Sequence, residues 1–310
     1  MITMPTVLVL GAGASAPFGF PCGGGLRSQI YQIFAQKQSP EVQQMLLADF
    51  TFEKISQFRH ALSRSGSMVD EFLEYRTDFM DVGKASIASV LLQDEGEASL
   101  FNVNVPNNWY ELLFRCLTLE SSFESFGKNK LSIITFNYDR SIEQYLFITL
   151  KNRYNRTEQE CAKKLEEIPI IHVHGTLGRL PWQQFWGPIV NYGGDINFQK
   201  IRDASKTIKV IHEDISDDPE FNQAYELMTA ATRIYFLGFG YHPINLKRLR
   251  IKKLIRKDMS GTAYHLPIYL RNNATSIKTR AGHPVIQLMH SPQSENIDVF
   301  TYLNYHVSLI

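Results

Sequence analysis

In this 310-residue chain, two short apolar runs end in polar residues whose side chains could bind a ligand or transfer a proton. Asn137 and Asp139 follow the β-type run 131–136, and because alternate residues of an extended chain project to one side, both side chains point the same way. They could share a ligand, or they could cap the helix expected next. His174 follows the run 168–173, and a neutral imidazole there could accept a proton.

Two further apolar runs open into glycine turns. The run 5–10 leads into Gly11-Ala12-Gly13-Ala14-Ser15, in which Gly11 is expected to adopt a positive φ and Gly13 to let the backbone approach a pyrophosphate. Amide groups at the start of the following helix would attract the phosphates. The run 233–237 opens in the same way at Gly238 and Gly240. The turns predict dinucleotide binding, with an ordinary tight turn at residues 11–15 as the alternative.

Elements that alternate between strand and helix must position these residues. In an open parallel sheet the loops at the carboxyl ends of the strands bind ligands, so we expect all four segments at one edge. The sequence therefore predicts an α/β fold, a Rossmann-like, mostly parallel sheet with helices on both faces. We expect one domain spanning 1–310, with further strands at 267–270 and 285–288.

Residues 27–128 show no convincing β run, and their apolar positions recur at helical spacing, which predicts a helical insertion after the first βα turn. Within it, Ser67 and Asp70 resemble a capping box, with a catalytic role for Asp70 as the alternative. Later in the chain, residues 246–257 carry seven Lys or Arg among leucines and isoleucines. They predict an amphipathic basic helix, either a solvated face or a docking surface for a partner.

Composition excludes several classes of protein. A formal net charge of +1 gives no reason to expect direct binding of nucleic acid, and no apolar run is long enough to cross a membrane, so we expect a cytoplasmic protein. Hydrophobic residues make up 44% of the chain, which argues against disorder. The three cysteines, Cys22, Cys116 and Cys161, form no Cys-x-x-Cys pair, so neither a disulfide framework nor a metal site is expected.

Taken in order, four motifs resemble the sirtuin family: the Gly11 to Ser15 turn, Thr135-Phe-Asn-Tyr-Asp139, His174-Gly175 and the late Gly238-Phe-Gly240. The resemblance spans nearly the whole chain. It implies cleavage of NAD, as substrate, at the bond between nicotinamide and ribose, with Asn137 positioning ribose or water and His174 as the general base. It also implies that Asp139 contacts nicotinamide and that residues 11–15 hold the diphosphate.

The chain departs from the protein deacylases of that family. It lacks their zinc module of two Cys-x-x-Cys pairs, and residues 19–25 lack the Asp and Arg that follow the glycine turn in deacylases. It instead resembles the zinc-free bacterial sirtuin-like NADases of anti-phage defence, in which water replaces the acyl oxygen. We therefore expect an NAD hydrolase that depletes NAD, an abortive-infection effector.

No sensor domain is recognisable in the sequence, so control is expected from a homo-oligomer or from a separate activating subunit, such as an ATPase or a phage-sensing protein. Two alternatives remain open. One is a non-catalytic module that senses NAD or ADP-ribose. The other is a zinc-free protein deacylase or ADP-ribosyltransferase.

Overall fold

The computed structural model of the chain describes all residues except 185, 211–217, 255, 280 and 290–296. Its six strands form one sheet in the order β3-β2-β1-β4-β5-β6, and every neighbouring pair is parallel. This is the strand order of a Rossmann-like fold, and the order reverses between β1 and β4. The predicted α/β class is confirmed. The strands are β1 (Thr6–Leu10), β2 (Leu131–Thr135), β3 (Ile170–His172), β4 (Arg233–Leu237), β5 (Asp258–Thr262) and β6 (Ile286–Met289).

Helices make up most of the remaining elements. The α-helices are α1 (Ala12–Ser15), α2 (Gly23–Ile33), α3 (Pro40–Leu47), α4 (Phe52–Ser65), α5 (Val69–Tyr75), α6 (Met80–Asp94), α7 (Glu97–Leu100), α8 (Trp109–Thr118), α9 (Ser141–Tyr154), α10 (Glu158–Leu165), α11 (Phe198–Thr207), α12 (Pro219–Ala230), α13 (Pro243–Arg248), α14 (Ile268–Ser276) and α15 (Val299–Thr301). Short 3₁₀ segments are η1 (Ala16–Phe18), η2 (Thr77–Phe79), η3 (Phe126–Lys128) and η4 (Ile251–Lys253), and η5 (Tyr302–His306) is a π-helical turn.

Both faces of the sheet are buried, which explains the unbroken apolar runs in β1 and β4. Leu8 and Leu10 belong to a large core shared with α8, α9 and the C-terminal turn. Val7 and Val9 point to the other face and pack in a smaller core with residues of α12, α13 and α14. Because successive side chains of a strand alternate between faces, a five-residue strand can supply both cores.

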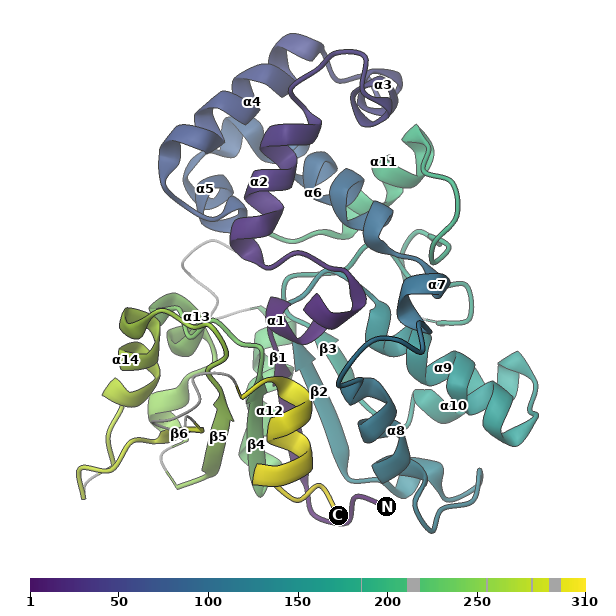
Figure 1. Cartoon of the computed structure of the whole chain (residues 1–310), viewed down its shortest axis with the longest axis vertical. Helices are drawn as coiled ribbons and strands as arrows, with labels where there is room; N and C mark the ends of the chain where they lie inside the picture. Colours follow the sequence, from purple (N-terminus) through teal and green to yellow (C-terminus); the bar gives the residue numbers. More distant parts are fainter. Residues whose placement is uncertain (185, 211–217, 255, 280, 290–296) are drawn as a thin grey trace.

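A layer of helices lies beyond the carboxyl ends of the strands (Figure 1). It contains α2 to α6, from the region predicted as an insertion, and no strand occurs between residues 11 and 130. The predicted start at residue 27 falls inside α2. The layer also includes α11, which comes from the segment between β3 and β4 and packs against α6 and α3. No pattern in the sequence predicted this contribution from a distant segment.

In the last quarter of the chain one strand was not predicted, and two predicted elements are wrong. Strand β5 was not foreseen, because Asp-Met-Ser-Gly-Thr lacks a β-branched apolar run. Residues 267–270, predicted as a strand, begin α14, whereas the strand predicted at 285–288 is present as β6.

The predicted basic helix at 246–257 is also wrong. It is broken at Arg250, which adopts a left-handed φ of 53° between α13 and η4, and residue 255 lies outside the described residues. Several of its cations are used inside the molecule. Arg248 pairs with Glu74, and the ammonium group of Lys257 donates to backbone carbonyls.

Candidate functional site

The four predicted motifs meet at one edge of the sheet. In the strand register, Leu10 is paired with Thr135 on one side and with Leu237 on the other, and Thr135 is paired with His172. The loops that follow these positions therefore begin at the same edge of the sheet, at the ends of four adjacent strands. Parallel pairing alone brings together segments that lie up to 230 residues apart in the sequence.

The glycine turn after β1 packs against the loop after β4. Gly11 has a φ of −118°, so the expectation of a positive φ there was wrong. A Cβ atom on Gly11 would lie 2.6 Å from the carbonyl oxygen of Gly238, and one on Gly13 would lie 2.9 Å from the Cα atom of Gly238. Gly238 itself has a φ of 57°. These glycines let two backbones touch, a packing role that the sequence did not reveal.

The amides of this turn are partly used inside the protein. The N–H of Gly11 donates to the carbonyl of Leu237 at 3.0 Å, and the N–H of Gly13 donates to Gly238 at 3.1 Å. The carbonyl of Ala14 accepts a hydrogen bond from the indole of Trp109 at 2.7 Å. The N–H of Ala14 donates to the carbonyl of Gly11 at 2.8 Å, so a diphosphate would have to bind amides of the turn other than those of Gly11, Gly13 and Ala14.

Asn137 connects the second motif to the first. Its side-chain nitrogen donates to the carbonyl of Gly11 at 3.1 Å and to Oγ of Ser15 at 2.9 Å. Asn137 and Ser15 are 8% and 2% exposed, so both lie at the floor of the site. With the amide nitrogen committed to these two acceptors, the side-chain oxygen Oδ1 is the atom of Asn137 that could meet a water or a ribose hydroxyl.

Asp139 is bound to the start of α9. Its Oδ1 accepts from the backbone N–H and the hydroxyl of Ser141, and the Ser141 hydroxyl also contacts that of Tyr110 at 2.7 Å. Burial raises the pKa of the Asp139 carboxyl, while hydrogen bonds from Ser141 and Ser15 act to lower it. The N-cap residue of α9 is Arg140 and no side chain caps this helix, so Asp139 holds Ser141 without acting as the N-cap.

His174 lies two residues beyond β3 in an aromatic surrounding. Its ring is 5.3 Å from that of Phe136, 6.2 Å from Phe221 and 6.3 Å from Tyr138. The ring is buried, and its Nε2 has no hydrogen-bond partner among the described residues. Burial, together with the charge of Arg248, lowers its pKa to about 3. His174 is therefore a neutral imidazole with an unused acceptor or donor, a feature that calls for a ligand or a water.

His172 has a different environment. Its Nε2 lies 2.5 Å from a carboxylate oxygen of Glu143 on α9, and its Nδ1 lies 2.9 Å from the carbonyl of Asn137. Burial acts to lower the pKa of His172, but Glu143 outweighs it and the pKa is raised. Both ring nitrogens have partners, so the contacts of His172 suit a residue that supports the site rather than one that reacts in it.

No role near this edge was predicted for three residues, Tyr138, Glu74 and Arg248. The hydroxyl of Tyr138 donates to Asp70 of α5, and Arg248 of α13 forms a buried ion pair with Glu74, also of α5. The predicted capping box at Ser67 and Asp70 is wrong, because α5 begins after Met68 and has no side-chain cap. The alternation of a strand did indicate that Tyr138 points away from Asn137 and Asp139. Nothing in the sequence indicated that Asp70 would meet it.

An open cavity of about 410 Å³ lies where the helical layer meets the sheet, lined by Arg27, Tyr31, Glu71, His242, Tyr269 and neighbours. None of the predicted site residues lines it.

In the described part of the chain no three His, Cys, Asp or Glu side chains are grouped so as to hold a metal ion. Within the same part, no helix is long and apolar enough to cross a membrane.

Comparisons with known proteins add no relative. No protein-family model matches the chain, and no curated protein matches it in sequence.

Proposed function

We propose that the protein hydrolyses NAD at the bond between nicotinamide and ribose. One observation supports this most: residues 11–15, Asn137, His174 and the 238–240 loop meet at the carboxyl edge of a parallel sheet, around the point where the strand order reverses. Open α/β sheets bind their ligands at such a point. The order of the four motifs and their resemblance to zinc-free sirtuin-like NADases supply the chemistry.

In this proposal the glycosidic C–N bond breaks first and its electron pair leaves with nicotinamide, which becomes neutral. The ribose carbon, left as an oxocarbenium ion, is attacked by water, and the water proton passes to Nε2 of His174. The products are nicotinamide and ADP-ribose. Because water bonded to an oxocarbenium ion is strongly acidic, a weak base with a pKa of about 3 suffices to accept this proton. Oδ1 of Asn137 would orient the water or a ribose hydroxyl.

The test is nicotinamide release by purified protein incubated with NAD. We expect His174→Ala to lower turnover by about 10²–10⁴-fold, the usual contribution of a general base. Asn137→Ala should also lose turnover, and His172→Ala should lower the melting temperature more than turnover, because His172 joins β3 to α9. Thermal melts of each variant confirm folding. A His174→Ala protein that retains wild-type turnover would show that His174 is not the base.

A module that binds NAD or ADP-ribose without cleaving it is the second candidate. The low pKa of His174 favours it, because a weaker base accepts a proton less readily. The same assay separates the two: the sensor binds NAD by calorimetry and releases no nicotinamide. We propose a role in anti-phage defence, and control by self-association or by an activating subunit, on the resemblance alone.

A further inference from the structure

Helix α5 is tied to the candidate site at two points. Asp70 accepts a hydrogen bond from the hydroxyl of Tyr138, in the loop after β2. Glu74, one turn later on the same face of α5, pairs with Arg248 of α13 at 2.8 Å. The side chains of Arg248 and Glu74 are 3% and 8% exposed, so the pair is shielded from water. The helical layer is thus joined by polar contacts to the loop after β2 and to α13, which follows β4.

Tyr138 stands between this helix and His174. Its ring lies edge-to-face with that of His174, at a centroid distance of 6.3 Å, within the range of favourable aromatic contacts. Its carbonyl accepts from the N–H of Leu177 at 3.1 Å and from the hydroxyl of Thr176 at 3.4 Å. The loop that carries His174 is therefore bound to Tyr138 through both ring and backbone.

The charges around this contact favour a protonated phenol. Burial raises the pKa of Tyr138 well above its ordinary value, and the neighbouring Asp70 raises it further. Burial also raises the pKa of Asp70, while Tyr138 and Arg248 act to lower it. Glu74 pairs with Arg248, whose charge also reaches His174. The phenol hydrogen is thus kept on Tyr138 and is donated to Asp70.

We propose that Tyr138 is a positioning residue, held by Asp70 of the helical layer, that fixes His174 relative to Asn137. The inference rests on the proposed NAD hydrolysis. Through the hydrogen bond between Asp70 and Tyr138, the helical layer affects the rate of turnover as well as the stability of the fold.

The test compares Tyr138→Phe, Asp70→Ala and the double variant in the full chain. Because displacement of a catalytic group by about 1 Å can cost about 10²-fold, we expect each single variant to lower kcat by 10- to 100-fold, with KM within about twofold. The double variant should be no worse than the singles, since all three break one contact. Asp70→Asn, which keeps an acceptor oxygen, should restore most of the kcat lost in Asp70→Ala.

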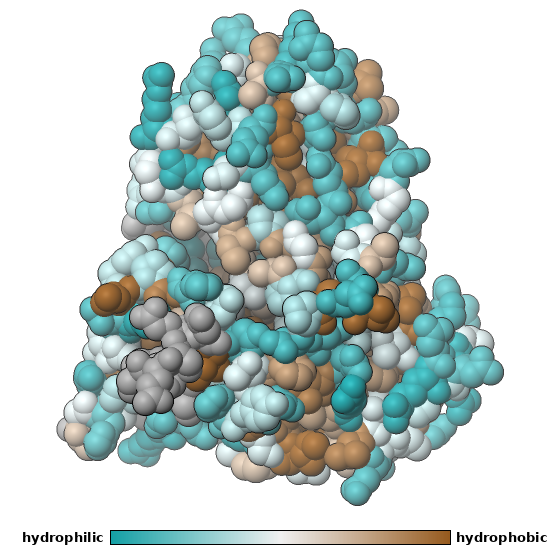
Figure 2. All heavy atoms as spheres, viewed as in Figure 1, coloured by the Kyte–Doolittle hydropathy of each residue, from teal (hydrophilic) through white to brown (hydrophobic). Residues whose placement is uncertain are grey.

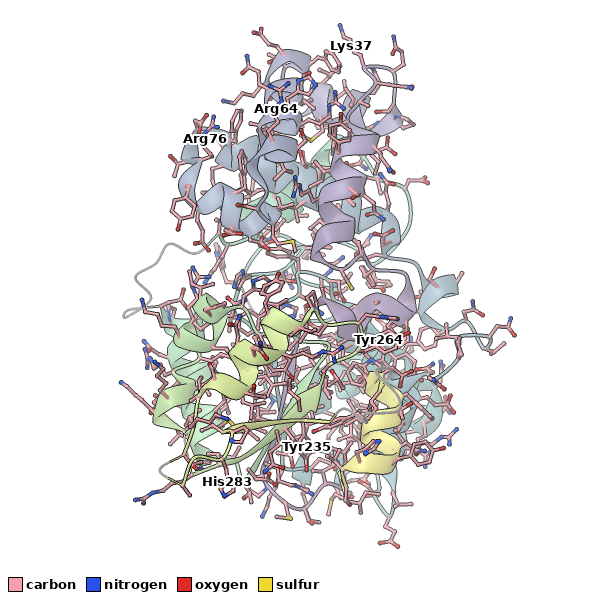
Figure 3. All side chains as sticks on the ribbon, turned by 60° about the vertical axis from the view of Figure 1, so that its left-hand side comes forward. Lys37, Arg64, Arg76, Tyr235, Tyr264 and His283 are labelled. Carbon is pink, nitrogen blue, oxygen red and sulfur yellow. The ribbon has the colours of Figure 1, made fainter. Side chains whose placement is uncertain are left out.

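Matched controls come from the same helical layer. Tyr75→Phe removes a hydroxyl from a residue of α5 that is 70% exposed. Asp78→Ala breaks an exposed ion pair with Arg76, which Figure 3 shows at the outer edge of the layer. Both should keep wild-type kcat. All rates are measured well below the melting temperature of the least stable variant.

A wild-type or raised kcat in Tyr138→Phe would overturn the proposal, and so would an Asp70→Asn variant as impaired as Asp70→Ala. A second readout does not depend on NAD. Hydrogen exchange of the Leu177 amide, which donates to Tyr138, should be faster in Tyr138→Phe and Asp70→Ala than in the controls. If the wild type releases no nicotinamide, the proposed function fails, and this exchange measurement alone decides whether Asp70 fixes the loop. Unchanged exchange would refute it.

Discussion

His174 is held neutral by its surroundings, and this makes the stability of the protein depend on pH. Its pKa of about 3 lies below the value of about 6.5 in an unfolded chain. Below pH 6.5 the unfolded state therefore binds a proton that the folded state does not, and stability is lost as the pH falls toward 3. Above pH 6.5 the imidazole is neutral in both states and contributes no pH dependence.

We predict that lowering the pH from 7 to 5 destabilises the wild type by about 2 kcal/mol more than the His174→Asn variant. The figure follows because pH 5 lies about 1.5 units below the pKa of about 6.5 that the imidazole has in the unfolded chain. Denaturant unfolding at both pH values measures this. His172→Asn is the control with the opposite sign, because the raised pKa of His172 makes its protonated form stabilising at low pH. Parallel pH profiles for the wild type and His174→Asn would contradict the assignment.

At the scale of elements, the contact between the turns after β1 and β4 limits which glycines can be changed. A Cβ atom on Gly13 would lie 2.9 Å from the backbone of Gly238, where neither side can yield easily. Gly24 in α2 has nothing within 4 Å of such an atom and an ordinary helical backbone.

We predict that Gly13→Ala lowers the free energy of unfolding by about 1–3 kcal/mol, the usual cost of overpacking. Gly24→Ala should change it by no more than about 1 kcal/mol, in the stabilising direction, because alanine is the better helix former. Denaturant titrations of the two variants decide this. Equal stability of Gly13→Ala and the wild type would mean that the two turns can separate, leaving Gly13 free for a ligand.

At the scale of the whole molecule, a second buried ion pair, beside that of Arg248 and Glu74, joins the helical layer to the loop after β2. Arg140 and Glu95 form a salt bridge with side chains 1% and 0% exposed, and Arg140 also donates to the carbonyls of Gly178 and Val190. Burial raises the pKa of Glu95, and Arg140 acts to lower it. The face of the molecule in Figure 2 is mostly hydrophilic, with apolar residues among the polar ones.

We predict that Arg140→Ala lowers the free energy of unfolding by about 3–5 kcal/mol, because it leaves a carboxylate buried without its partner. The matched control is Arg115→Ala, which breaks a pair with Glu111 whose side chains are 71% and 50% exposed. That change should cost less than about 0.5 kcal/mol. Similar losses of unfolding free energy in the two variants, measured by urea unfolding, would show that the buried pair stabilises the protein no more than the exposed pair does.

The sequence by itself determined the strands whose pattern of apolar residues matches their burial in the folded protein. The apolar runs of β1, β2 and β4 are buried on both faces, and an unbroken apolar run is what such a strand requires. The positions of Asn137 and Gly238 after their strands followed from these runs, and that of His174 followed from the apolar run 168–173. Parallel pairing then had to bring them to one edge, so the location of the candidate site could be predicted before any contact was known.

Only the tertiary structure decided which of these residues face a ligand and which hold the protein together. Gly13 packs on Gly238, Asn137 donates to Ser15, and Asp70 meets Tyr138. Each of these contacts joins segments whose approach depends on how strands and helices pack, and local pattern carries no record of that approach. Strand β5 was missed for the same reason, since its place beside β4, and not its composition, makes Asp-Met-Ser-Gly-Thr a strand.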